Sequence, residues 1–445
     1  MINNLIPFVL VGYFLFFLKN NHLNNVLTSL IFVSFFAFST NYTDFKLDFD
    51  IFRYLHRTIG VLVVIALVLH IFKHRINVFK EPVIRILALF FLVLLLSFIG
   101  NEIYVKDYVH YVRNFIFISS IVVYLYYMID SRVKIEELFN LIIAITVILS
   151  CFMVLEVIQY GFSIGDWGFG RKGVRKSLNF GNANYLAYAL FPGFVLTVFS
   201  KKSYIMWFFA PLVIFAIFAT ESKSVYLSSI FVIFLYVYQR LNKKFYLILV
   251  LLGISTIFLS LYNQIVTNKN FSSTRYVIAK IALNVFQEHP INGMGYGQFK
   301  TKFYHYIDQD TLRIADKEIT EAFFANNPNS SLFENTKYEG MSQSDKQNII
   351  DLSGKDKMTH NDLLTVIAEL GLIGLAFLFF LFYKLYLELE KLLLHDREYF
   401  FLSIGLIGGS LIFSMFHNNL TSFVFWFVIF IPFIMNRNNK KQLKV

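Results

Sequence analysis

Long apolar runs separated by short polar connections dominate the chain. A run of about 20 apolar residues is long enough to cross a bilayer as an α-helix. The pattern predicts an all-α polytopic membrane protein with about 12–13 transmembrane helices. The predicted spans are residues 5–18, 26–38, 52–72, 83–100, 109–129, 138–160, 183–199, 203–219, 224–239, 245–262, 363–385, 399–416 and 421–435.

One long polar segment, residues 263–359, interrupts this pattern between the tenth and eleventh predicted spans. Ordinary connections run to about 4–6 residues, so a segment of this length has a role of its own. Apolar spacing predicts a short helix over Thr274–Glu288 within it. The glycines of Gly293-Met294-Gly295-Tyr296-Gly297 predict a tight turn, because no βαβ unit surrounds them to make a dinucleotide site.

The chain therefore divides into four parts by sequence pattern. Residues 1–262 form membrane helices and include a basic segment at 161–181, and residues 263–359 form one large loop. Residues 360–435 return to membrane helices, and residues 436–445 form a basic tail.

Basic residues in the short connections predict the orientation, because such residues mark the cytoplasmic side. Both the basic segment and the large loop then fall on the outer face, with the carboxy terminus inside and the amino terminus not assigned. The clusters are Lys73, Arg75, Lys80 and Arg85; Arg132 and Lys134; Lys201 and Lys202; Arg240, Lys243 and Lys244; and Arg437, Lys440, Lys441 and Lys444.

Composition agrees with a membrane protein. Of 445 residues, 57% are hydrophobic and 16% are charged, and the mean hydropathy is +0.58. The net charge of +11 lies mainly in the topology-determining connections, so we expect no nucleic acid partner. The single cysteine, Cys151, excludes an intrachain disulfide.

His360 is the first candidate for chemistry, because a histidine at the start of a membrane helix can take a proton from a hydroxyl group. The alternative is that the segment only caps the helix, through Thr359 or Asn361. Asp362 and Glu369 are seven residues apart on one helical face, which points Glu369 into the bundle. Glu369 is then either a functional carboxylate or a structural hydrogen-bond partner.

The basic outer segment is the second candidate. Four cations gather on the side that should be poor in them: Arg171, Lys172, Arg175 and Lys176. Arginine forks match phosphate oxygens, so these residues could hold a pyrophosphate at headgroup depth. Ordinary anionic headgroups are the alternative ligand.

Three further polar positions lie at the predicted outer ends of helices. Asn184 could cap its helix or bind sugar hydroxyls. Lys223 is an outer cation that could equally snorkel to the membrane surface. Arg275 opens the predicted loop helix, where a cation is unfavourable for the helix dipole and an anionic ligand would be favourable.

The acid pairs Asp48-Phe49-Asp50 and Asp308-Gln309-Asp310 resemble those that hold a metal and a nucleotide-sugar in soluble glycosyltransferases. Both pairs fall on the predicted outer face, away from such donors. We therefore expect no metal site there.

The ordered set of motifs resembles the O-antigen ligase and polymerase family of bacterial polysaccharide assembly. The resemblance covers about residues 161–383, and its most specific part is His360-Asn361 followed by Glu369-Leu370-Gly371-Leu372-Ile373-Gly374. The family's histidine falls on His360 and its loop arginine on Arg275. Its Ser-Arg pair falls on Ser222-Lys223, so lysine replaces a bidentate arginine.

The resemblance implies a GT-C-like glycosyltransferase in the bacterial cytoplasmic membrane, active on its outer face without a metal or another cofactor. The implied donor is a glycan on undecaprenyl pyrophosphate and the implied partner is a glycan acceptor. It further implies pathway partners, a chain-length regulator and a flippase.

The sequence leaves three functions open. A polymerase of lipid-linked repeat units is the first, since it covers capsule, exopolysaccharide and O-antigen pathways. A ligase that transfers finished polymer is the second. A flippase or another transporter is the third, although the chain shows no inverted repeat of the kind that transporters carry.

Overall fold

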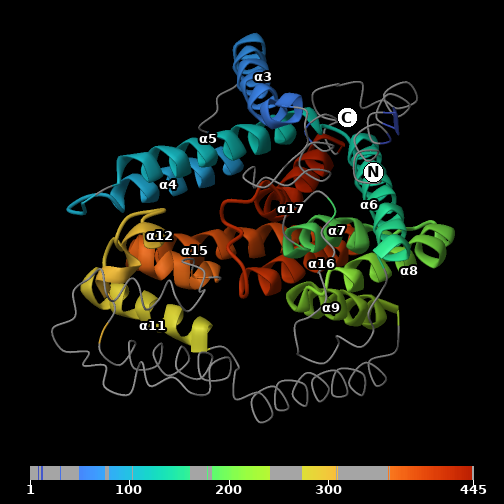
Figure 1. The fold of residues 1–445 in the computed structure, drawn as a ribbon. Helices are drawn as coiled ribbons and strands as arrows, with labels where there is room; N and C mark the ends of the chain where they lie inside the picture. The colour runs from blue at the N-terminus through green and yellow to red at the C-terminus, as the bar shows by residue number, and fades with distance from the viewer. Residues whose placement is uncertain are drawn as a thin grey trace, which may run out of the picture.

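The computed structural model describes residues 9, 12–13, 31, 50–75, 80–102, 104–160, 178, 183–240, 273–306, 308, 359 and 361–442. Every element that it describes in these ranges is a helix, and Figure 1 shows their arrangement. The all-α prediction is confirmed for this part of the chain.

The predicted spans that fall on the described residues coincide with helices. These are α3 (Asp50–His74), α4 (Pro82–Leu96), α5 (Val105–Met128), α6 (Arg132–Tyr160), α7 (Ala183–Val198), α8 (Ser203–Ala219), α9 (Lys223–Arg240), α15 (Asp362–His395), α16 (Arg397–Ser414) and α17 (Phe423–Gln442). Predicted span 245–262 lies outside the described residues, as do almost all of 5–18 and 26–38.

Length and composition single out three described helices as able to cross a membrane: Val105–Met128, Arg132–Gln159 and Asp362–His395. Several others are apolar but shorter, among them Ala183–Val198 and Ser203–Ala219. The chain is therefore a helical protein with membrane-spanning candidates, and the total of about 12–13 spans stays a prediction.

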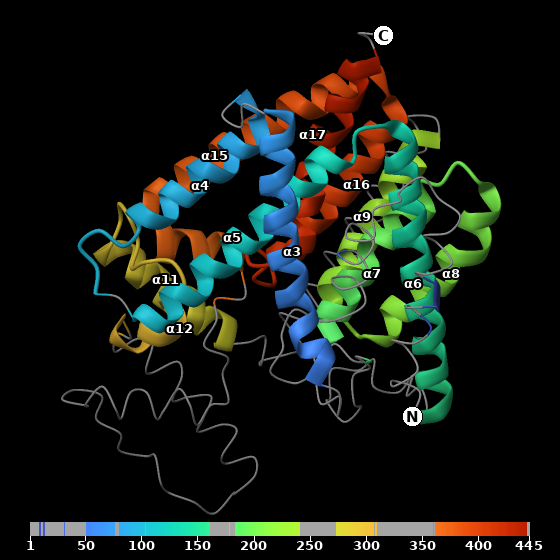
Figure 2. The ribbon, with the colours of Figure 1, turned by 90° about the horizontal axis from the view of Figure 1, so that it is seen from above.

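The helices form two groups joined by the carboxy-terminal ones. Helices α6, α7, α8 and α9 pack together with α16 on one side, whereas α3, α4 and α5 lie on the other side with α17 and α15 (Figure 2). Because α15 contacts both α16 and α17, these three helices connect the groups.

Aromatic side chains fill the contact between α4, α5, α15 and α17. The ring of Phe90 lies 4.7 Å from that of Phe377, 5.1 Å from that of Phe115 and 5.3 Å from that of Trp426. Phe90 and Trp426 are fully buried. Each large ring buries roughly 150–250 Å² of surface, so this cluster is a main source of cohesion among these four helices.

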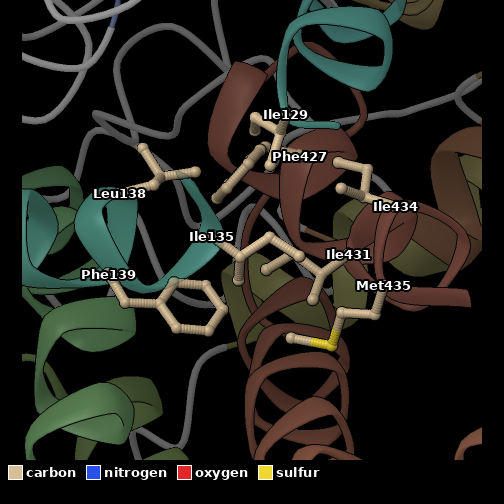
Figure 3. A pocket seen from close by; sticks show the side chains of 8 residues that line it. All are labelled: Ile129, Ile135, Leu138, Phe139, Phe427, Ile431, Ile434 and Met435. Carbon is tan, nitrogen blue, oxygen red and sulfur yellow. The ribbon is translucent and has the colours of Figure 1, made fainter. Parts of the chain in front are cut away.

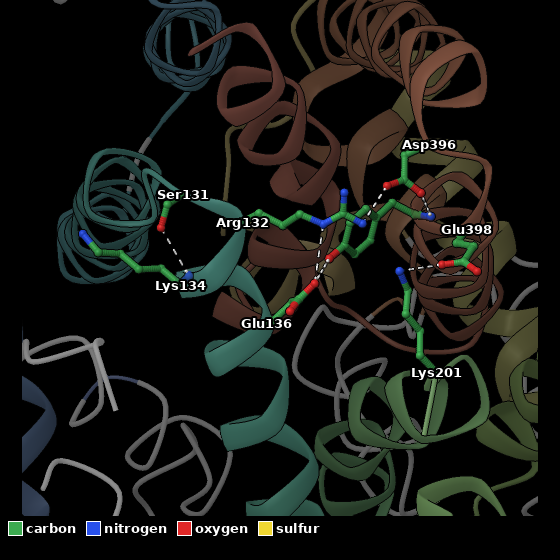
Figure 4. A network of polar contacts seen from close by, with 8 residues as sticks. Ser131, Arg132, Lys134, Glu136, Lys201, Asp396 and Glu398 are labelled. Carbon is green, nitrogen blue, oxygen red and sulfur yellow. Dashed lines mark hydrogen bonds and ion pairs between the residues drawn. The ribbon is translucent and has the colours of Figure 1, made fainter. Parts of the chain in front are cut away.

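The predicted cytoplasmic connections meet at one end of the bundle. Arg132 Nη2 lies 3.1 Å from Asp396 Oδ2, and Lys201 Nζ lies 2.8 Å from Glu398 Oε2 (Figure 4). The guanidinium of Arg437 lies over the ring of Tyr126 at 4.6 Å. Separate basic clusters therefore lie at the same end of the bundle, and the side of the membrane that this end faces stays a prediction.

A small apolar pocket lies at this end, between the start of α6 and the end of α17 (Figure 3). It is lined by Ile129, Ile135, Leu138, Phe139, Phe427, Ile431, Ile434 and Met435. All of its lining side chains are apolar, so this pocket offers no polar side chain to a ligand.

Candidate functional site at the predicted outer end

The turn between α16 and α17, residues 415–422, is the centre of a polar cluster at the opposite end. Asn361 ties the start of α15 to it. The Asn361 side chain accepts hydrogen bonds from the backbone N–H groups of Leu363 at 2.8 Å and Leu364 at 3.1 Å, which makes it the helix cap. Its amide donates to the carbonyl of Met415 at 2.9 Å.

Asp362 makes the second tie between α15 and this turn. Its buried carboxylate accepts from the backbone N–H of Asn419 at 2.8 Å and from that of Leu420 at 3.1 Å. Thr359 Oγ1 donates to Asn418 Oδ1 at 3.0 Å. The two chain neighbours of His360 are therefore both held against the turn, while His360 itself lies outside the described residues.

The start of α9 joins the cluster through His417. The ring Nε2 of His417 lies 3.1 Å from Ser224 Oγ, and Ser224 Oγ lies 3.3 Å from Ser222 Oγ. Lys223 stands between these serines and is exposed. Glu221, the residue before Ser222, has a φ of 54°. This is a left-handed conformation that only surrounding contacts maintain in a non-glycine residue.

Helix α7 approaches the same turn through stacked rings. Tyr188 stacks on Phe413 with centroids 4.3 Å apart, and Phe413 stacks on His417 at 4.4 Å. Asn184 is half-buried one turn before Tyr188. Three predicted site residues, Asn184, Lys223 and Asn361, thus lie at the starts of α7, α9 and α15. These three helix ends meet around the α16–α17 turn.

Helix α15 is interrupted at Gly371, which has φ 61° and ψ −152°. Such a break leaves backbone groups without partners inside an apolar helix, which is costly in a membrane. The chain at 290–299 supplies the partners. Met294 and Gly295 donate to the carbonyls of Ala368 at 2.9 Å and Glu369 at 3.1 Å.

The second half of α15 is completed from the same segment. Leu372 and Ile373 donate to the carbonyls of Pro290 at 2.8 Å and Ile291 at 3.0 Å. A Cβ built on Gly371 would lie 2.6 Å from the Ile291 carbonyl, so only glycine allows this approach. Gly371 therefore allows a close contact between α15 and this segment of the predicted loop.

The side chain of Glu369 holds the segment as well. Its two carboxylate oxygens accept from the N–H groups of Gly297 at 2.8 Å and Phe299 at 3.0 Å. Glu369 is buried, and this geometry is the structural hydrogen-bond role anticipated as one alternative. Gly293, Gly295 and Gly297 all have positive φ, which confirms the predicted tight turn.

Segment 290–299 also binds the connection between α4 and α5. Asn101 donates to the Gly293 carbonyl at 2.8 Å, and Asn292 donates to the Ile99 carbonyl at 2.6 Å. Tyr104 N–H donates to Gln298 Oε1 at 2.9 Å. This part of the predicted loop is therefore buried between α15 and the α4–α5 connection.

Tyr296, within the glycine turn, belongs to the core. Its side chain is 2% exposed, and its ring lies 5.6 Å from that of Tyr111. Burial, with a contribution from the negative charge of Glu369, raises the pKa of Tyr296 well above its usual value. The ring therefore packs as a neutral phenol.

The loop helix is confirmed as α11 (Ser273–Glu288), which packs against α15 and lies beside it in both views (Figures 1 and 2). Its buried face is formed by Ile278, Ile281, Ala282 and Val285, four of the residues whose spacing predicted it. Arg275 is in the first turn of α11, and the position of its side chain lies outside the described part.

Two short elements follow the glycine turn, α12 (Phe299–Lys302) and a 3-10 helix at Phe303–Tyr306. Burial lowers the pKa of Lys302, whose ammonium donates to the carbonyl of Glu102. Asp308, one member of a predicted acid pair, lies 3.4 Å from Lys280 Nζ, and Asp310 is outside the described residues.

The basic outer segment with Arg171 and Arg175 also lies outside the described residues, so its role stays a prediction. Sequence reasoning missed His417, although one signal was present: His417-Asn418-Asn419 is a polar triplet between two apolar runs at the predicted outer face. Across the described ranges, no three His, Cys, Asp or Glu side chains are grouped to hold a metal ion.

Comparison with known proteins adds one match. The family model described as O-antigen ligase matches residues 204–322, which include α8, α9, α11 and segment 290–299. A search of curated proteins found no match. The family match supports a ligase- or polymerase-type glycosyltransferase function in general terms. The resemblance to the O-antigen ligase and polymerase family that the motifs predicted is confirmed by this match over residues 204–322.

Proposed function

We propose that the protein polymerises glycan repeat units carried on undecaprenyl pyrophosphate, on the outer face of the bacterial cytoplasmic membrane. The observation that carries the proposal is the convergence around the α16–α17 turn. Asn361, Asp362 and Ser224 all bind that turn or its histidine, so the neighbours of His360 and Lys223 share one polar cluster.

The proposed chemistry is a single displacement at the anomeric carbon of the donor. His360 takes the proton of an acceptor hydroxyl, and the oxygen attacks the anomeric carbon. The bond between that carbon and the pyrophosphate breaks, so undecaprenyl pyrophosphate leaves with the bonding electrons. Inversion of the anomeric configuration follows from one displacement.

Cations would stabilise the departing pyrophosphate. Arg275 is the main candidate, with Lys223 and the two arginines of the basic outer segment, Arg171 and Arg175, as further contacts. A preorganised cation is most effective where water is excluded. The mechanism therefore requires these side chains to reach the cluster around His417, with Asn184 and Asn361 available to sugar hydroxyls.

Lipid-linked glycan in a deletion strain separates polymerase from ligase. Single repeat units on the carrier are expected, because without a polymerase the units are not joined into a chain. Full-length polymer retained on the carrier would instead identify a ligase, which is the activity named by the matching family description.

Substitution of the two assigned catalytic residues tests the mechanism. His360→Ala and Arg275→Ala are expected to abolish polymer, since general-base catalysis alone contributes about 10²–10⁴-fold. His395→Ala is the matched control, because His395 is exposed at the far end of α15. Normal polymer with both test variants would refute the assignments.

Purified protein distinguishes an enzyme from a transporter. The protein is incubated with lipid-linked glycan in the absence of any energy source or ion gradient. Extension of the glycan is expected, and movement of glycan across the membrane without bond formation would refute the proposal.

A further inference from the structure

The outer half of α5 carries a row of basic side chains. Lys106, His110 and Arg113 are spaced i, i+4 and i+7, which places them on one helical face, and all three are exposed. The row extends about 10 Å along the helix axis at the rise of an α-helix. The buried side chains of α5 nearest to it, Phe115 and Ile118, lie on the other face.

The row is held together and extended by its neighbours. A guanidinium nitrogen of Arg113 lies 3.3 Å from the His110 ring, and the Asn114 amide lies 3.1 Å from it. Lys300, exposed in α12, adds a positive charge close enough to act on His110. The nearby carboxylate of Asp107 is hydrogen-bonded to Thr301.

These cations lack acidic partners. Within the described part of the chain, no carboxylate lies within ion-pair distance of Lys106, Arg113 or Lys300. The row also stands at the end predicted to face outward, where basic residues are disfavoured. Cations on the exposed face of a membrane helix favour a nearby anion, which a lipid headgroup can supply.

We propose that this face of α5 binds the phosphate headgroups of anionic phospholipids in the outer leaflet. The occupant follows from the charge and the position. The row is exposed, and it lies at the helix end where the predicted topology puts the outer headgroups, which long basic side chains can reach from a helix. The inference is independent of the proposed enzymatic activity.

A local photo-crosslink tests the proposal on the full-length protein. Val109, 52% exposed beside the row, is replaced by p-benzoylphenylalanine (Val109→p-benzoylphenylalanine). The protein is placed in nanodiscs of phosphatidylcholine with a minority of phosphatidylglycerol, and the masses of the lipid adducts are compared. Enrichment of phosphatidylglycerol above its share of the bilayer is expected.

The matched variant carries Lys106→Gln, His110→Gln and Arg113→Gln. Each cation contributes about fivefold in headgroup preference, so loss of Lys106 and Arg113 lowers the enrichment by about 25-fold. Lys202→Gln, at an exposed lysine of the opposite end, should leave the adducts at position 109 unchanged.

Two further measurements keep the result decisive. Arg113→Lys keeps the charge and should retain the enrichment, whereas its loss in this variant would show that the positive charge is not what selects the lipid. Equal adducts in the wild type and the triple variant would overturn the proposal. Preference for undecaprenyl phosphate over phosphatidylglycerol, in discs that contain both, would also overturn it in favour of a carrier-binding face.

Discussion

The clamp between Glu369 and segment 290–299 makes the most exacting prediction. Glu369→Ala removes the acceptor of two buried backbone N–H groups, those of Gly297 and Phe299, at 2.8 and 3.0 Å. Each buried donor left without a partner costs about 1–3 kcal/mol, so the variant should lose about 2–6 kcal/mol from the local free energy of opening. Even the lower value corresponds to an equilibrium constant for local opening that is about thirtyfold larger.

Hydrogen exchange of the purified protein measures this effect, because exchange of protected amides reports the local opening free energy. Peptides covering 290–299 should exchange at least about thirtyfold faster in the variant. The matched control is Glu390→Ala in the same helix, an exposed carboxylate whose loss should cost less than about 0.5 kcal/mol. Unchanged exchange in 290–299 after Glu369→Ala would refute the reasoning.

Three further predictions rest on other contacts. Gly371→Ala should lower the melting temperature more than Gly100→Ala: both have positive φ, but an added Cβ at Gly371 meets the Ile291 carbonyl at 2.6 Å and at Gly100 meets nothing within 4 Å. Ser224→Ala and His417→Gln should each cost about 0.5–1.5 kcal/mol in unfolding experiments, and the double variant should cost less than their sum. Arg132→Gln breaks a partly exposed ion pair with Asp396. The free energy of unfolding should therefore fall by no more than about 1 kcal/mol.

Local patterns predicted the helices well. The apolar runs mark α3 through α9 and α15 through α17, because a chain that must satisfy its backbone in lipid has few alternatives to a helix. The spacing of Ile278, Ile281 and Val285 predicted the buried face of α11. The glycine turn was predictable for a similar reason, since positive φ is easily adopted only by glycine.

The long-range contacts were not predictable from these patterns. Glu369 and Gly297 are separated by 72 residues, and Ser224 and His417 by 193. Hydropathy alone describes 363–385 as one continuous run, because Gly371 can sit in a helix or interrupt it. The choice depends on segment 290–299, whose backbone completes the broken helix.

The family resemblance identified candidate residues in the sequence, but it did not predict their contacts in space. Its motifs fall on His360-Asn361 and on Ser222-Lys223, and the structure brings the starts of α9 and α15 together at the α16–α17 turn. Asn361 is occupied by capping and by the Met415 carbonyl, so a sugar contact would have to use what remains of its side chain. His417 was missed because a lone histidine in a short connection has no distinctive spacing.

The break in α15 connects the two parts of the candidate site. Residues 362–370 form a short helix of about 13 Å that is anchored at both ends. Its start is bonded to the α16–α17 turn through Asp362, and its end is bonded to segment 290–299 through Glu369. That segment continues directly from α11, whose first turn contains Arg275. The short helix therefore links the polar cluster beside His360 to the element that carries the proposed cation. A continuous helix would lack the backbone groups that bind 290–299, so the linkage depends on the interruption at Gly371.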